Sequence, residues 1–161
     1  MSLLGRHDPL ADAGELVPRV YAYVAYRIGH GPDAEDVTGE TFVRAVRYRD
    51  SYDPGKGSAV GWLIGIASRC ISDAVKAADP GLAIDSEPAD GLADRIVERV
   101  TVQAAVARMD ERDRELIALR YGADLTARQI GARLELKTNA VEVALHRALN
   151  RLRDDLQAAP Q

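Results

Sequence analysis

Apolar side chains recur every three or four residues through the first half of the chain, and this spacing places them on one face of an α-helix. The pattern predicts three helices, at about residues 15–29, 32–48 and 58–78. Pro18 falls in the first turn of the first helix, where its missing N–H is tolerated, and Ser58 is suited to cap the third. A run rich in Pro, Gly and Asp at 52–57 predicts a turn between the second helix and the third.

The second half keeps the same period and predicts four more helices, at about residues 94–108, 110–121, 126–134 and 138–156. Gly122 is a natural helix stop, and Thr126 and Thr138 have side chains suited to begin a helix. The last two helices are separated by about three residues and the second is the longer, which is the spacing of a helix-turn-helix.

Residues 79–93 contain two Pro and two Gly without a helical period, and they predict a flexible linker. The linker separates a domain at 1–78 from a domain at 94–161. The expected fold class is therefore all-α, with two small helical domains joined by a flexible acidic linker, the C-terminal one a helix-turn-helix. The abundance of Ala, Leu, Val and Arg over aromatic residues agrees with helices rather than strands.

The net charge of −4 resides in the linker, which carries four acidic and no basic residues, so both domains are close to neutral. Tight non-specific DNA binding by the chain alone is therefore not expected, because that affinity grows with the number of phosphates neutralised. No apolar run approaches the ~20 residues that span a membrane, which predicts a cytoplasmic protein without membrane insertion. The single cysteine, Cys70, excludes an intramolecular disulfide and a zinc site of several cysteines, and its apolar helical setting predicts burial.

The sequence contains no recognisable catalytic constellation. His7, His30 and His146 are far apart without a pattern of partner residues. The stretch GKGS at 55–58 lacks the glycine four residues earlier that a phosphate-binding loop requires. We therefore expect a protein that is not an enzyme and that holds no metal or cofactor.

Two stretches carry the signature of a known family. The first is PDAEDVTGETFVRAVR at 32–47 with SYDPGKGSAVGWLIGIASRCISDAVK at 51–76, and the second is MDERDRELIALRYGADLTARQIGARLELKTNAVEVALHRALNRLR at 109–153. The first resembles the polymerase-binding and promoter-melting segments of extracytoplasmic-function sigma factors, and the second resembles their C-terminal helix-turn-helix. The resemblance implies an alternative sigma factor, which binds core RNA polymerase and directs transcription from promoter DNA with a −10 and a −35 element.

The polymerase-binding residues that the resemblance implies lie on the helix at 32–48. Asp36 and Glu40 are four residues apart on one face, where like charges repel, so a basic partner surface would compensate them. In the family this segment docks on the clamp helices of polymerase. The residues that match it are Asp33, Glu35, Asp36, Glu40 and Phe42, and for Asp33 and Glu35 pairing with the helix dipole is an equally good explanation.

The third helix and the loop before it resemble the segment that reads and opens the −10 element. A melted strand needs a stacking surface or a pocket for a flipped base, and we expect it at 52–61 and the start of the helix. The candidate −10 contacts are Trp62, Arg69, Asp73 and Lys76, although Trp62 lies on the apolar stripe and fits a core position better. The family usually ends this helix with several arginines where only Lys76 remains, so contact with duplex DNA is expected to be weak.

The helix-turn-helix keeps the packing pattern of the family but departs from it where DNA is read. The candidate DNA contacts are Arg128, Gln129, Lys137, Thr138, Asn139, His146, Arg147 and Arg151. Arg147 and Arg151 suit phosphates, and a salt-bridged helix face is the alternative for them. Glu135 stands where the family commonly has a turn glycine, and Glu142, Val143 and Ala144 replace its usual polar and basic face. The resemblance therefore implies the fold but not the promoter sequence.

Two other interpretations remain open. A sigma-like regulator would bind polymerase or a partner without productive promoter recognition, and the acidic Glu142 on the recognition helix favours it. A helix-turn-helix repressor with a helical sensing domain would leave the match at 32–76 unexplained. Members of the family are often held inactive by an anti-sigma protein that covers both domains, so the resemblance also implies an anti-sigma factor as partner.

Overall fold

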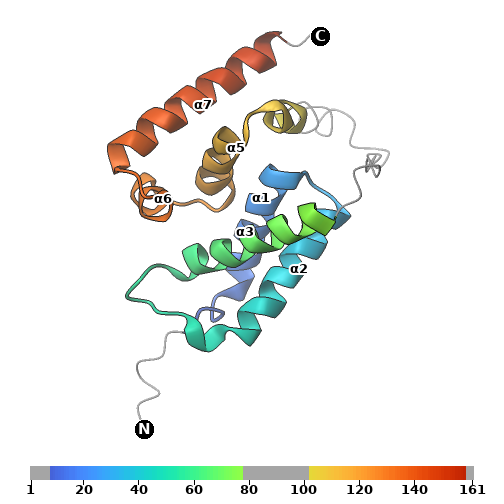
Figure 1. Ribbon diagram of the computed structural model, residues 1–161, viewed down its shortest axis with the longest axis vertical. Coiled ribbons are helices and arrows are strands. Elements are labelled where there is room, and N and C mark those ends of the chain that lie inside the picture. The colour runs from blue at the N-terminus through green and yellow to red at the C-terminus, as the bar shows by residue number, and fades with distance from the viewer. Residues whose placement is uncertain (1–7, 78–101, 159–161) are drawn as a thin grey trace.

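The computed structural model describes residues 8–77 and 102–158 (Figure 1). The N-terminal part consists of α1 (Ala13–Ile28), α2 (Pro32–Arg47), the short 3₁₀ turn η1 (Arg49–Ser51) and α3 (Ala59–Ala77). The C-terminal part consists of a helical stretch at 102–108, α5 (Glu111–Ile117), the π-helical η2 (Ala118–Gly122), α6 (Ala127–Leu134) and α7 (Thr138–Ala158). Neither described part contains a β-strand, so the all-α expectation is confirmed. The predicted linker at 79–93 and the start of the helix at 94–108 lie outside the described residues.

Local hydrogen bonds begin the helices at the predicted residues. Thr126 and Gln129 form a capping box on α6, in which the Thr126 hydroxyl accepts from the Gln129 N–H at 3.1 Å. In return, the Gln129 side-chain oxygen accepts from the Thr126 N–H at 2.9 Å. The Ser58 hydroxyl oxygen accepts from the Gly61 N–H at 3.1 Å and caps α3. Thr138 begins α7, as predicted.

The prediction that Pro18 lies in a first turn was wrong. The Asp12 carbonyl accepts from the N–H groups of Glu15 and Leu16, at 2.9 and 3.1 Å, and these bonds start α1 at Ala13. Pro18 is therefore inside the helix, where it removes one backbone hydrogen bond. Packing of the apolar face of α1, with Leu16 and residues beyond it buried, outweighs that loss.

The helix that begins as α5 widens into a π-helix before it ends at Gly122. The Ala123 N–H donates to the carbonyl of Ala118, five residues earlier, at 2.9 Å. Such wide turns are rare and occur frequently at functional sites. Gly122 lies against α1, because a Cβ atom built on it would be 2.7 Å from the backbone nitrogen of Tyr23 and 2.8 Å from its Cα. This close approach of two backbones leaves no room for a larger residue.

One continuous apolar core joins the two parts. Val20, Tyr23 and Val24 of α1 are fully buried and belong to the same cluster as Leu116 and Leu119. Helix α1 lies between the α2–α3 pair and the α5–η2 segment (Figure 1). The buried position predicted for the single cysteine is confirmed. Within the described residues, no helix is long and apolar enough to cross a membrane, and no group of three or more His, Cys, Asp or Glu is placed to hold a metal ion.

Candidate polymerase- and DNA-binding surfaces

Helix α2 has a buried side and an exposed side. The buried side consists of Ala34, Val37, Thr38, Thr41 and Ala45. The two threonine hydroxyls are satisfied within the helix, because each donates to the carbonyl four residues earlier, at 2.7 and 2.8 Å. The candidate acids Asp33, Glu35, Asp36 and Glu40 are all exposed. The structure thus places them together on the accessible side of one helix.

Phe42 does not share the exposed face of Asp36 and Glu40. It is partly buried and packs against the core. The exposed apolar side chains are Val43 and Val46, with 53% and 58% of their surface accessible. Val43 is three residues after Glu40 and seven after Asp36, so it lies on their face. The apolar spacing included both valines but did not show that they are exposed, because two of the core-facing positions of α2 are threonines.

The expected repulsion between Asp36 and Glu40 is offset within the chain. Arg44 donates to Glu40 at 3.0 Å and also forms an ion pair with Asp73 of α3 at 3.0 Å. These bonds to Glu40 and Asp73 raise the pKa of the Arg44 guanidinium. Arg44 therefore supplies at Glu40 the compensation that was expected from a basic partner surface, and the case for a docking surface rests on exposure and on the two valines.

The loop at 52–61 is held in shape by its own side chains. The Tyr52 hydroxyl donates to the Gly57 carbonyl at 3.2 Å, and the Asp53 carboxylate accepts from the Gly55 N–H at 2.9 Å. The Tyr52 ring lies 5.5 Å from the Trp62 ring, centre to centre, with a tilt of 56°. Trp62 is half-buried, so it is neither a full core residue nor freely exposed. The pair forms an aromatic wall on which a base can stack.

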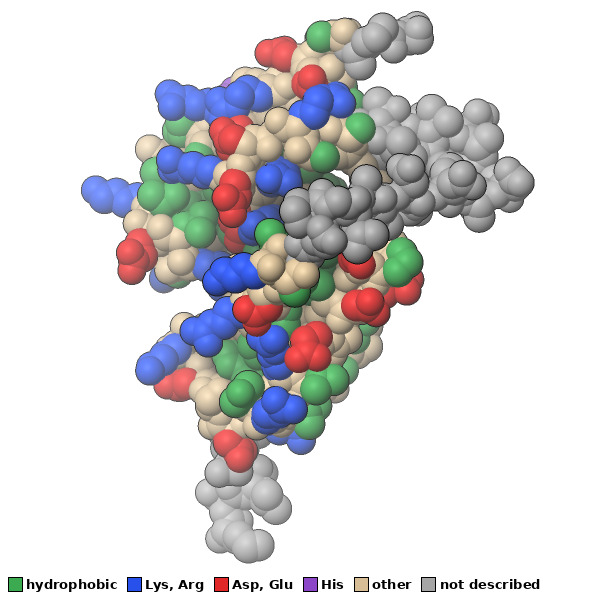
Figure 2. Space-filling model, turned by 45° about the vertical axis from the view of Figure 1, so that its right-hand side comes forward, with side chains coloured by type: hydrophobic (Ala, Val, Ile, Leu, Met, Phe, Trp, Pro, Cys, Tyr) green, Lys and Arg blue, Asp and Glu red, His purple; other side chains and the backbone are tan. Residues whose placement is uncertain are grey.

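This aromatic wall borders a hollow of about 400 Å³ between the two parts of the chain. On one side the hollow is lined by Tyr52, Lys56 and Trp62, and on the other by Gln129 and Arg133 of α6. Lys and Arg side chains flank the indentation between the two halves of the molecule in the view of Figure 2. Aromatic rings beside cations match the chemistry of a single-stranded nucleic acid.

The other −10 candidates lie along α3. Arg69 and Lys76 are exposed, and they remain candidates for contact with the DNA backbone. Asp73 is held by Arg44 of α2, which directs its carboxylate toward the neighbouring helix.

The turn of the helix-turn-helix adopts a left-handed conformation at Glu135, with φ 58° and ψ 44°. This is the position at which the family commonly has a turn glycine. The turn is tight, because a Cβ atom on Gly131 would lie 2.5 Å from the carbonyl oxygen of Leu136, and the Leu136 N–H donates to the Gly131 carbonyl at 2.8 Å. Ile130 and Val141 are fully buried behind it, as the packing pattern predicted. The fold of the motif therefore survives the glutamate.

The recognition helix α7 exposes a mixed face. Its exposed residues near the turn, together with the residue before the helix, are Lys137, Thr138, Asn139, Glu142 and Val143. Further along, Arg147 is exposed and the His146 ring nitrogen lies 3.3 Å from the Asn150 amide nitrogen. Arg128 and Gln129 of α6 are exposed as well. The candidate DNA contacts thus lie on the accessible surface of α6, α7 and the turn between them.

Arg151 has a partner inside the domain. Its Nε and Nη2 donate to the two oxygens of Asp113, at 2.7 and 2.9 Å, and Asp113 is only 5% exposed. The hydrogen bond to Asp113 raises the pKa of the arginine. This ion pair ties α7 to α5, yet 56% of the Arg151 side-chain surface stays accessible, so a phosphate contact remains a prediction for both Arg147 and Arg151.

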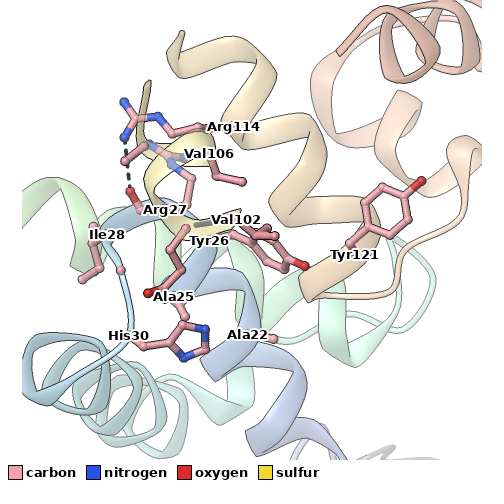
Figure 3. A pocket seen from close by; sticks show the side chains of 13 residues that line it. Ala22, Ala25, Tyr26, Arg27, Ile28, His30, Val102, Val106, Arg114 and Tyr121 are labelled. Atoms are coloured by element: carbon pink, nitrogen blue, oxygen red, sulfur yellow. Dashed lines mark hydrogen bonds between the residues drawn. The ribbon is translucent and has the colours of Figure 1, made fainter. Parts of the chain in front are cut away.

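A larger pocket of about 810 Å³ opens where the end of α1 meets the helical stretch at 102–108 (Figure 3). Tyr26, Val102 and Val106 contribute apolar surface to it. Two of its lining residues carry buried donors without an acceptor, namely the Nε of Arg114 and the Nε2 of Gln103. A buried donor of this kind costs about 1–3 kcal/mol, so the pocket favours an occupant that supplies oxygen acceptors beside an apolar surface.

Comparison with known proteins assigns both parts of the chain. The family description "Sigma-70 region 2" matches residues 13–80, and "Sigma-70, region 4" matches residues 105–154. ECF RNA polymerase sigma factor SigD of Mycobacterium tuberculosis is 33% identical over 177 aligned positions, which cover 98% of this chain and 82% of that protein. ECF RNA polymerase sigma factor SigW of Bacillus subtilis is 27% identical, and the alignment covers 95% of this chain and 91% of SigW.

The chain belongs to the extracytoplasmic-function (ECF) family of RNA polymerase sigma factors. As an ECF sigma factor it is an alternative transcription initiation factor, which binds RNA polymerase and promoter DNA. Its fold resembles that of CnrH in complex with the cytosolic domain of CnrY, with a TM-score of 0.67 and 24% identity over 94% of this chain and 86% of CnrH. It also resembles RpoE of Bartonella quintana in complex with the anti-sigma factor NepR, with a TM-score of 0.66 and 20% identity over 92% of this chain and 96% of RpoE.

Proposed function

We propose that this ECF sigma factor binds its partners through three separate surfaces. The exposed face of α2 binds core polymerase through its acids, Asp33, Glu35, Asp36 and Glu40, together with Val43 and Val46. The loop at 52–61 with Trp62 captures the melted −10 strand. The exposed face of α6 and α7 reads the −35 duplex.

The observation that carries the polymerase assignment is the two-sided character of α2. One side is packed into the core, while the other presents Asp36 and Glu40 beside two valines that are more than half exposed. Exposed apolar side chains rimmed by charge are typical of a protein interface. Among the described residues, neither Val43 nor Val46 belongs to the hydrophobic core or packs against it.

The test is binding of the full chain to core RNA polymerase after the double change Asp36→Arg and Glu40→Arg. We expect binding to weaken at least about 100-fold, because two like charges facing a basic partner are each worth more than about 1 kcal/mol. The matched control is Asp12→Arg with Glu15→Arg, which changes the net charge equally at exposed positions at the start of α1. Equal affinity of both variants and wild type would remove the polymerase role from α2.

A sigma-like regulator without productive promoter reading is the second candidate, and Glu142 with Val143 on the exposed face of α7 favours it. Glutamate repels phosphate, although it accepts a hydrogen bond from cytosine N4. The two candidates are separated by letting the assembled holoenzyme select sequences from a random DNA library. Enrichment of two elements at −35 and −10 supports the promoter-reading factor, and holoenzyme that enriches no −35 element supports the regulator.

We also infer that an anti-sigma factor is a partner, since the similar solved structure of RpoE is a complex of that sigma factor with the anti-sigma factor NepR. The pocket of about 810 Å³ beside α1 suits an amphipathic segment that offers an acceptor to Arg114 and Gln103. A protein that represses this factor should lose affinity for Tyr121→Glu, a half-exposed residue of the pocket wall. Core polymerase binding by that variant should be unchanged.

We further propose that the chain acts in the cytoplasm and is not an enzyme.

A further inference from the structure

Asp113 and Arg151 form an ion pair with one buried end and one accessible end. Within residues 8–77 and 102–158, Asp113 of α5 is the only charged residue that is buried, and its side chain is 7% exposed. The Arg151 side chain on α7 is 56% exposed. A buried carboxylate needs its partner in place, so Asp113 holds Arg151 firmly while the guanidinium still reaches the surface.

The pair uses only one edge of the guanidinium. Nε and Nη2 of Arg151 donate to the two oxygens of Asp113, at 2.7 and 2.9 Å. A guanidinium is planar and carries five N–H groups, so this fork leaves N–H groups on Nη1 and Nη2 without an acceptor in the described part of the chain. The fork also fixes the plane of the group, so the remaining N–H groups point away from the buried carboxylate. Arg151 therefore presents a fixed donor edge to an acceptor outside the chain.

The chemistry of this edge favours a phosphate. The planar set of N–H groups on a guanidinium matches the oxygens of a phosphate, with which arginine forms paired hydrogen bonds. Arginine loses much rotamer freedom when it is ordered, and Asp113 has restricted Arg151 before any ligand binds. Arg147, one turn earlier on α7, is exposed and would have to be ordered by the DNA itself. Arg151 is thus the better prepared of the two candidate phosphate contacts.

The position of Arg151 along α7 fits the same acceptor. A recognition helix contacts base edges with residues near its N-terminus. Arg151 lies thirteen residues after Thr138, the first residue of α7, which is about 20 Å along the helix axis. The major groove is about 12 Å wide, so a residue this far along the helix meets the sugar–phosphate backbone rather than the base edges.

We propose that Asp113 is a positioning residue for −35 binding, which holds Arg151 so that its remaining N–H groups donate to a backbone phosphate of the duplex. The inference rests on the proposed role of α6 and α7 in −35 reading and adds a residue that is buried behind the accessible face. A buried acid thereby strengthens the binding of a polyanion, which is the opposite of what its charge alone would do.

The test compares Asp113→Asn with wild type, each assembled with core polymerase into holoenzyme. Binding is measured to a duplex that carries only the −35 element selected by the holoenzyme, and to a duplex of scrambled sequence. Asp113→Asn keeps one acceptor oxygen and a similar volume but opens the fork. We expect the affinity for the −35 duplex to fall about tenfold. Charge alone predicts a rise, because the substitution removes an acid near DNA.

Asp155→Asn is the matched control. Asp155 also lies on α7 and forms an ion pair with Nη2 of Arg108 at 2.7 Å, so its substitution makes the same change of charge and removes a tie on the same helix. It releases no arginine of α7, and the −35 affinity should therefore equal or exceed that of wild type. An affinity of Asp113→Asn at or above wild type, or an equal loss in Asp155→Asn, would overturn the positioning role.

Arg151→Gln shows whether Asp113 acts through Arg151. The slope of log affinity against log salt concentration should fall by about 0.9, the value for one phosphate contact on duplex DNA. The double variant Asp113→Asn with Arg151→Gln leaves no unpaired buried carboxylate, and it should bind −35 duplex no more weakly than Asp113→Asn alone. Urea unfolding establishes that each variant is folded under the binding conditions. A further loss of affinity in the double variant, or an unchanged slope in Arg151→Gln, would contradict the inference.

The same measurements separate this inference from the proposed role of α6 and α7. Wild-type holoenzyme that binds −35 and scrambled duplex equally would reject −35 reading by this face, and the inference with it. A preference for the −35 duplex that persists at wild-type strength in both Asp113→Asn and Arg151→Gln would reject the positioning role alone.

Discussion

Helices α1 and α2 each have 16 residues and belong to the same domain, yet a row of side chains on α1 contacts the second domain, whereas a row on α2 faces solvent. Arg19, Tyr23 and Arg27 follow one another at four-residue steps on α1 and all bind groups of the second domain. Asp36, Glu40 and Val43 follow at similar steps on α2 and lie on its accessible side. The comparison teaches that a regular row identifies a contact surface, while burial decides whether its partner is the same chain or another molecule.

The largest effect is expected from Arg27→Ala, which tests whether the row on α1 is structural. The substitution leaves the Glu115 carboxylate, which is only 16% exposed, beside Tyr23 without its counter-charge, and this should cost about 2–3 kcal/mol of unfolding free energy. Urea denaturation followed by circular dichroism measures it. Arg47→Ala, in the last turn of α2, is exposed and should change stability by less than about 0.5 kcal/mol. Equal losses of unfolding free energy in the two variants would contradict the structural role of the row on α1.

The next effect is expected from Val43→Asp, which tests whether the row on α2 serves another molecule. Core polymerase binding should weaken about tenfold, because an interface position would then bury a charge, while the melting temperature stays the same. Val75→Asp is the control, since Val75 is 62% exposed on α3 and lies outside the α2 surface. A loss of thermal stability without a loss of binding would place Val43 with the structural residues of α1.

The smallest effect concerns alkaline pH. Burial, and then the nearby Glu115 carboxylate, raise the pKa of Tyr23 well above its ordinary value. Because the folded pKa is the higher one, the neutral tyrosine contributes stability that is present below pH ~10 and is lost as the pH rises further. Tyr23→Phe should cost about 1 kcal/mol at neutral pH, through the lost hydrogen bond, and should flatten the decline above pH ~10. Unfolding curves between pH 8 and 11 test this, and an unchanged slope in the variant would assign the decline to other groups.

Features set by neighbouring residues were predictable from the sequence. Thr126 and Thr138 begin their helices where expected, helical structure ends at Gly122, and Glu135 occupies the turn. These features depend on hydrogen bonds between residues a few positions apart, so local sequence contains the necessary information. The start of α1 was missed because packing of its apolar face outweighed the penalty of an internal Pro18.

The contacts between distant segments were not predictable in this way. Tyr23 and Glu115 are 92 residues apart, and neither is unusual among its neighbours in sequence. The same holds for the assignment of Val43 rather than Phe42 to the exposed side of α2, which depends on how α2 packs on α1 and α3. Of the candidate sites, the residue types were recognised from the family pattern, while their accessibility and their internal partners required the fold.

The long separation in sequence between α1 and the residues of the second part that bind it has a consequence for the order of synthesis. A ribosome makes α1, α2 and α3 before it makes α6, which begins at Ala127, fifty residues after α3 ends at Ala77. At about 5–20 residues per second, several seconds pass in which α1, α2 and α3 have been made and the helix-turn-helix has not. During synthesis the N-terminal helices therefore exist for a time without the C-terminal part that packs on α1, and core polymerase can bind them in that time.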